Sequence, residues 1–272
     1  MTILIVLVGL LISHFATGFR HLRRFEWVGP PLLWLQRRFP AQPWLPAVAL
    51  IVAVVALAWL SVWALTAVLG LVGAFLLALV VFILTLGPRD LDHDVAIICG
   101  RVDADEAEVR AARRAMRLDA QARAPEGAAA VFHAGLSRWF GLLFWFVLLG
   151  ITGALIYRLT RVALQLDQAD PQVLEWLARL RLVLDWPVLA LLTVSLALVN
   201  DLDRVLGAWR AQREHVPAWL MTPAMLDRLA ASLVVDSSEL ADGVSIGHQM
   251  VWRILVLWLV VLSVLLLAGW LA

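Results

Sequence analysis

A dense group of ionisable residues follows the end of a long apolar stretch at residues 84–95, which read LTLGPRDLDHDV. If residues 89–98 are helical, Asp90 and Asp94 share one face, as do Arg89 and His93. Two carboxylates one turn apart can hold Mg²⁺ and a phosphate group, because Mg²⁺ binds a few oxygen ligands and keeps its waters. An ordinary helix start with acids at its positive end would show the same pattern. Both interpretations stay open.

A second polar group lies at residues 131–140, VFHAGLSRWF, where another apolar stretch begins. His133 and Ser137 are four positions apart and would share a helix face, with Arg138 beside them. We expect the two groups to meet in a polar pocket, because each lies beside a predicted cytoplasmic boundary of the membrane. The alternative is that Arg138 reaches lipid phosphates at an ordinary interfacial helix start, while the carboxylates of the first group point into water.

The predicted pocket has the chemistry of an anion site. A guanidinium combines fixed positive charge with a fork geometry that suits phosphate or carboxylate. The predicted ligand-binding residues are Arg89, Asp90, Asp94, His133, Ser137 and Arg138. Any metal ion, Mg²⁺ for example, would be held by Asp90 and Asp94, and we predict no catalytic residue.

The rest of the sequence offers little further chemistry. Cys99 is alone, so there is no disulfide framework and no cysteine-based metal site. The Walker A, HExxH, GxSxG and GxGxxG patterns do not occur. Polar residues of the last loop could join a site, although a solvated loop is the favoured interpretation; they are Asp201, Asp203, Asp242 and His248.

The composition indicates a membrane protein. Of the 272 residues, 62% are hydrophobic, and the mean hydropathy is +0.87, whereas soluble domains are close to half apolar. The formal net charge of +1 gives no reason to expect a nucleic acid partner.

Apolar segments predict an all-α, polytopic membrane protein with five or six transmembrane segments, which form one integral membrane domain over residues 1–272. Residues 2–16 are apolar but short, and would cross or re-enter the membrane. Residues 45–86 carry no charge and would form about 63 Å of helix, twice the ~30 Å hydrocarbon core. We therefore expect a hairpin that bends near Gly70 and Gly73. Further spans are predicted at 139–157, 183–199 and 251–270.

Two features of the later segments add detail. Residues 158–182 read as a short polar link between spans. Gly150 and Gly153 would permit either close packing of the 139–157 span against a neighbour or a kink within it. In the preceding polar segment, we expect Asp103 and Glu106 to form a helix-capping pair.

The distribution of arginine orients the chain. The loops at about 17–44, 87–138 and 201–250 all contain Arg and fall on one side if every apolar segment crosses. The positive-inside rule places that side in the cytoplasm, so we expect a multi-pass protein of the bacterial inner membrane with helical cytoplasmic loops.

Several motifs together resemble the AmpE family. They are GPRDLDHDV, GRVDADEAEVRAARRAM, FHAGLSRWFGLLFWFVLLGITGALIYRL and LDWP, and the resemblance covers nearly the whole chain. AmpE proteins are bacterial inner-membrane proteins linked to β-lactamase induction and commonly encoded beside the cell-wall amidase AmpD. The resemblance implies a regulatory or sensory protein of cell-wall stress, with a ligand or partner at its cytoplasmic face. An AmpD-like amidase or another soluble regulator is the implied partner.

AmpE is in turn similar to the CobD/CbiB family, whose membrane enzymes join an aminopropanol phosphate to a corrinoid carboxylate with ATP and Mg²⁺. That family carries an E-N-x-x-D motif, and this chain has His133, Ala134 and Ser137 at the corresponding positions. The missing carboxylates favour a regulatory protein over an enzyme. A ligase with altered chemistry stays the alternative, and a structural protein that docks a soluble partner on residues 87–138 is the third hypothesis.

The predicted topology is testable with single cysteines. We expect Ala107→Cys to react with a membrane-impermeant maleimide only when the reagent reaches the cytoplasmic side, and a cysteine at the hairpin tip near Gly70 only from the periplasm. Labelling of Ala107→Cys only from the periplasm would overturn the orientation.

Overall fold

The computed structural model describes residues 2–15, 25–87, 89–200, 207, 210, 223–234 and 238–269, and every regular element in these ranges is a helix. Within these described ranges, four helices are long and apolar enough to cross a membrane: Leu45–Leu69, Ala124–Ala163, Pro171–Val199 and Leu240–Leu265. The predicted all-α class and membrane character agree with this. Two further apolar helices, Ile3–Ile12 and Leu71–Thr85, are shorter, so a count of five or six spans stays a prediction.

The chain divides into two compact units. Unit 1 comprises Met1–Pro88, Gly141–Leu184 and Leu265–Ala272. Unit 2 comprises Arg89–Phe140 and Asp185–Val264.

Unit 1 contains apolar helices that surround one buried cluster. Its helices are α1 (Thr2–Phe15), η2 (Glu26–Val28), α2 (Gly29–Arg38), α3 (Leu45–Leu69), α4 (Leu71–Thr85), α8 (Gly141–Ala163) and the first part of α9 (Pro171–Val199). Side chains from five of these elements form the cluster, among them Val28, Leu32, Leu50, Leu159 and Leu177. The predicted polar link at 158–182 is wrong over 158–163 and 171–182, which belong to α8 and α9 and contribute buried residues such as Leu159 and Leu177 to this cluster. Residues 164–170 connect the two helices.

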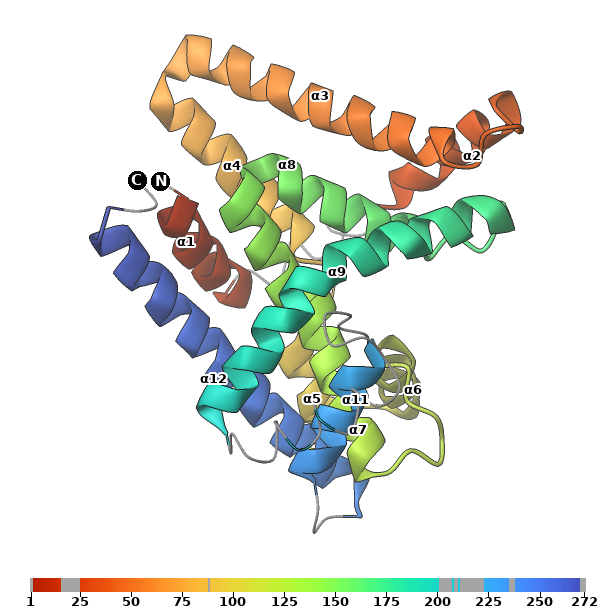
Figure 1. The fold of residues 1–272 in the computed structure, drawn as a ribbon, viewed down its shortest axis with the longest axis vertical. Coiled ribbons are helices and arrows are strands. Elements are labelled where there is room, and N and C mark those ends of the chain that lie inside the picture. Colours follow the sequence, from red (N-terminus) through yellow and green to blue (C-terminus); the bar gives the residue numbers. More distant parts are fainter. Residues whose placement is uncertain are drawn as a thin grey trace. The chain divides into compact units, whose positions relative to one another are not determined.

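Two glycine corners reverse the chain in unit 1. The predicted hairpin at 45–86 is confirmed: α3 and α4 meet at Gly70, whose φ of 63° and ψ of −149° favour glycine. Gly150 interrupts α8 with nearly the same angles, φ 62° and ψ −143°, and α8 changes direction there (Figure 1). The local sequences match as well, VLGLVGA at 68–74 and LLGITGA at 148–154.

The second glycine of each corner lets the two arms approach. A Cβ at Gly73 would lie 2.5 Å from the Leu65 carbonyl oxygen, and one at Gly153 would collide with the carbonyl of Trp145. The expected close packing at Gly153 is therefore confirmed, although its partner is the preceding arm of the same helix. Of the two alternatives for Gly150, the kink is the one confirmed, since Gly150 interrupts α8 and a Cβ there would meet open space. At the first corner, Gly70 makes the turn and Gly73 follows it on α4. The Trp59 indole of α3 donates to the Thr152 hydroxyl at 2.9 Å and braces the second corner.

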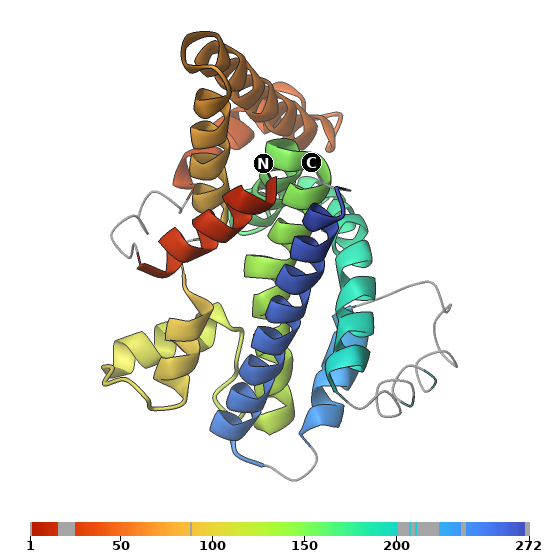
Figure 2. The same cartoon turned by 90° about the vertical axis from the view of Figure 1, so that its left-hand side faces the viewer.

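Unit 2 begins with short helices that follow one another closely. They are α5 (Leu91–Ile98), α6 (Glu106–Ala115), α7 (Ala124–Gly135) and the π-helix η3 (Leu136–Phe140), and the unit also contains α11 (Pro223–Leu233) and most of α12 (Leu240–Leu267). Figure 2 shows α5 and α6, in yellow, lying side by side. The capping pair expected at Asp103 and Glu106 is wrong, because the observed pair lies two residues later. Asp105 accepts from the Glu108 backbone N–H at 2.7 Å, and Glu108 accepts in return from the Asp105 N–H.

Small residues bring α7 and α12 into close contact. A Cβ at Gly243 would collide with the backbone of Ala124, and one at Gly247 would lie 3.0 Å from the Cα of Ala128. Glycines four residues apart allow this approach of two backbones. The predicted polar loop at 201–250 is therefore wrong over its last eleven residues, which form the start of α12 and pack on α7.

The Gly150 corner predicts a stability difference between two glycine substitutions. Gly150→Ala forces a side chain into a backbone conformation that L-residues rarely adopt, and we expect a loss of about 1–3 kcal/mol. Gly207→Ala is the control, because a Cβ there meets nothing within 4 Å and its φ is not positive. Thermal unfolding in detergent measures both, and equal midpoints for the two variants would contradict the assigned corner.

Candidate functional site

The polar segment at 84–95 leads into the short helix α5. Asp90 is the N-cap of α5, with extended backbone angles (φ −80°, ψ 130°), and its side chain accepts from the Asp92 backbone N–H at 3.2 Å. Leu91, Val95 and Ile97 bury the apolar face of α5. Asp90 is thus engaged in starting the helix, and the next acids project from its first turn.

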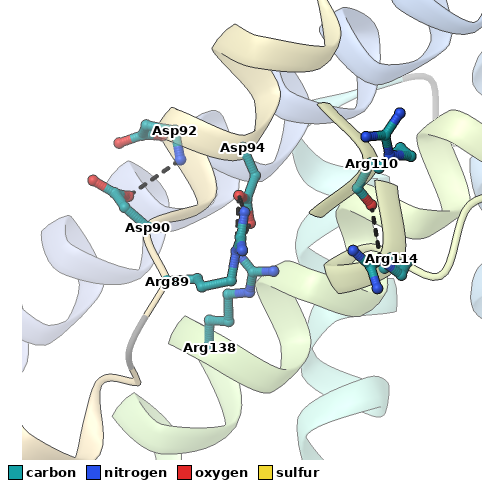
Figure 3. Close-up of polar contacts among 7 residues, drawn as sticks. All are labelled: Arg89, Asp90, Asp92, Asp94, Arg110, Arg114 and Arg138. Atoms are coloured by element: carbon teal, nitrogen blue, oxygen red, sulfur yellow. Dashed lines mark hydrogen bonds and ion pairs between the residues drawn. The ribbon is translucent and has the colours of Figure 1, made fainter. Parts of the chain in front are cut away.

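Asp94 is the centre of the site. Its side chain is only 1% exposed and lies between two guanidinium groups (Figure 3). Arg89 donates from Nη2 to Oδ1 at 2.6 Å and from Nε to Oδ1 at 3.1 Å. Arg138 donates from Nη1 to Oδ2 at 2.7 Å. One buried carboxylate therefore pairs with two cations, of which Arg89 lies 5 residues before it and Arg138 lies 44 residues after it.

The cluster carries excess positive charge. Two guanidiniums and one carboxylate leave a formal charge of +1. Within the described part of the chain, Arg138 uses only Nη1 on a carboxylate, whereas a guanidinium has five N–H donors. Its side chain is 13% exposed and that of Arg89 is 39% exposed, so both are accessible from solvent. The arrangement is suited to a further anion, phosphate or carboxylate.

The structure brings together three of the six predicted ligand-binding residues, Arg89, Asp94 and Arg138. His133 lies elsewhere, where its Nε2 is 2.6 Å from Oδ1 of Asp227 on α11. The Ser137 hydroxyl donates to the Ala134 carbonyl at 3.0 Å. His133 and Ser137 therefore have their partners outside the cluster. The binding role of Arg89, Asp94 and Arg138 stays a prediction.

The predicted metal pair is not formed as expected. Asp90 caps α5 while Asp94 faces the guanidiniums, and the two carboxylates point to different surroundings (Figure 3). Among the described residues, no group of three or more His, Cys, Asp or Glu side chains could hold a metal ion.

A second polar group on α5 includes His248, which the sequence offered as a possible site residue although a solvated loop was the favoured interpretation. Asp92 Oδ1 lies 2.7 Å from Nε2 of His248 and accepts from the Trp252 indole at 2.9 Å. Trp252 also packs edge-on against Trp139, with ring centroids 5.6 Å apart. The i, i+4 spacing of His248 and Trp252 was the available signal, but it is informative only if residues 240–252 are assigned to a helix. Asp242 is exposed, and Asp201 and Asp203 lie outside the described residues.

Cys99, at the end of α5, lacks the features of a reactive thiol. Burial raises its pKa, the Arg101 guanidinium lowers it, and the Asp242 carboxylate raises it further. A thiol with a raised pKa holds less thiolate at neutral pH and reacts slowly. Labelling of an introduced cysteine such as Ala107→Cys therefore has a low background.

Asp94 should contribute more to stability than its neighbour Asp90. Asp94→Asn leaves two guanidiniums without a counter-charge, and we expect a loss of about 2 kcal/mol, below the ~3–5 kcal/mol of a fully buried pair because Arg89 can turn toward water. Asp90→Asn is the matched control, since Asn caps a helix as well as Asp. Thermal unfolding in detergent compares them. An Asp94→Asn variant as stable as Asp90→Asn would show that the buried pair is not stabilising.

Comparison with known proteins adds no assignment. No protein-family model matches the sequence, and no curated protein or solved structure shows significant similarity to it.

Proposed function

We propose that this chain is a regulatory or sensory membrane protein that binds an anionic ligand through Arg89 and Arg138. The observation that carries the proposal is the sharing of one buried carboxylate by two guanidiniums. A structural ion pair needs only one cation for each carboxylate. The second cation leaves charge and hydrogen-bond donors that a phosphate or carboxylate ligand would satisfy.

The partial burial of the cluster supports binding of an anion over simple solvation. Arg138 is 13% exposed, and charges interact more strongly where water is partly excluded. Arg89 is more exposed, at 39%, and lies at the open side of the cluster. A ligand would meet Arg89 first and then compete with Asp94 for Arg138.

The resemblance to AmpE gives the proposal its biological setting. A protein of this type would report on cell-wall stress from the inner membrane and influence β-lactamase induction. A soluble regulator, such as an AmpD-like amidase, would be the partner on the cytoplasmic face. The CobD/CbiB-like ligase stays second, because Asp90 and Asp94 have separate roles in this chain.

Phosphate should stabilise the protein through Arg138. At about ten times its Kd, a ligand that binds only the folded state adds roughly 1.4 kcal/mol of stability. We expect a higher unfolding temperature in phosphate than in chloride of equal ionic strength, and loss of this difference in Arg138→Gln. Arg114→Gln is the control, because Arg114 is exposed on α6 and donates to the Arg110 carbonyl. An equal response to the two salts in the unmodified protein would refute phosphate binding.

Mass spectrometry of small molecules retained by the purified protein would identify the natural ligand. The Arg138→Gln and Arg114→Gln variants also test the proposed regulatory role. In cells challenged with a β-lactam, Arg138→Gln should alter β-lactamase induction and Arg114→Gln should not. Unaltered induction in a strain that lacks the protein altogether would remove the AmpE-type role while leaving anion binding intact.

A further inference from the structure

The π-helix η3 separates two α-helical segments of one continuous apolar helix. It comprises Leu136–Phe140, between α7 and α8, within the stretch Ala124–Ala163. A π-turn closes hydrogen bonds from i to i+5 where an α-turn closes them from i to i+4, so it contains one extra residue. Such segments are rare and frequently occur at functional sites.

Three consecutive residues of η3 each have a different partner. Arg138 binds Asp94 of α5 at 2.7 Å. Trp139 packs on Trp252 of α12 at 5.6 Å between ring centroids. Phe140 packs on Trp258, also of α12, at 5.1 Å. The segment therefore contacts α5 and α12 at the same time.

Together with α5 and α12, these contacts form a closed series that begins and ends on α5. Asp94 joins α5 to Arg138, and the neighbouring Trp139 joins the same segment to Trp252. Trp252 and His248 both bind Asp92, which lies two residues before Asp94 on α5. The position of Arg138 is thus fixed by its own ion pair and by the aromatic contact of the next residue.

We propose that η3 is a one-residue insertion that positions Arg138 for anion binding. The inference rests on the proposed function and names the element that makes the site. The contact between α7 and α12 is already made before the extra residue. Gly247 on Ala128 and Gly135 on Val251 fix α7 against α12 before the segment begins, and α8 follows it as a regular helix up to Gly150. The extra residue serves to bring Arg138 onto α5 while Trp139 stays on α12.

Deletion of one residue tests the insertion directly. Removing Ser137 converts the π-turn to an α-turn, and the hydroxyl of Ser137 bonds only locally to Ala134. We expect the deletion variant, purified as the full chain in detergent, to stay folded, with an unfolding temperature no lower than that of Asp94→Asn, because Arg89 still pairs with Asp94. The rise of that temperature in phosphate over chloride should be lost, since Arg138 no longer reaches the site.

Two control variants separate the insertion from general disruption. Ser137→Ala keeps the residue count and should keep both the stability and the phosphate response. Deletion of Val131, which is fully buried in the regular part of α7, rotates all later residues by about 100° and should abolish folding.

Each result has one interpretation. If deletion of Ser137 unfolds the protein as deletion of Val131 does, or if it leaves the phosphate response intact, the positioning role is wrong while anion binding stands. If the unmodified protein shows no phosphate response, the proposed function fails and the positioning role fails with it. A folded Ser137 deletion would then still identify η3 as an insertion that helix packing does not need.

Discussion

The burial of Asp94 is the constraint on which the arrangement of unit 2 depends. A carboxylate that is 1% exposed is unfavourable by several kcal/mol unless cations and hydrogen bonds replace its water. Arg89 and Arg138 supply both. Arg89 lies directly before α5 and Arg138 lies in η3, so satisfying one charge also fixes the start of one helix against the middle of another. The same contact therefore stabilises the fold of unit 2 and concentrates the positive charge of the candidate site.

The glycine contacts between α7 and α12 determine which side chains of α12 lie next to this charge cluster. Gly243 and Gly247 let the two backbones approach, and in lipid such close packing replaces the hydrophobic effect as the source of helix association. With α12 held at this distance, His248 and Trp252 reach Asp92, and Trp252 also reaches Trp139. Two acids on one short helix are thus satisfied from two directions.

The sequence allowed the hairpin and its bend at Gly70 to be predicted, because an uncharged stretch of this length is too long for one membrane crossing. It also allowed the proximity of Arg89 and Arg138 to be predicted, because both lie beside a predicted membrane boundary. It failed at 158–163, 171–182 and 240–250. Amphipathic helices there bury only one face, so their average polarity resembles that of a loop. The π-helix could not be predicted, since one extra residue leaves the apolar pattern of 131–146 unbroken. His133 and Ser137 were assigned to the site on α-helical spacing, and each has another partner in the structure.

The corner at Gly70 also has a consequence for the lipid around it. The 25 residues of α3 extend about 37 Å, whereas the 15 residues of α4 extend about 22 Å. Neither length equals a hydrocarbon core of ~30 Å. A bilayer accommodates a long segment by tilting it and a short one by thinning around it. A hairpin whose unequal arms both crossed the membrane would impose a local gradient of bilayer thickness, and the length of the lipid acyl chains would then affect its stability.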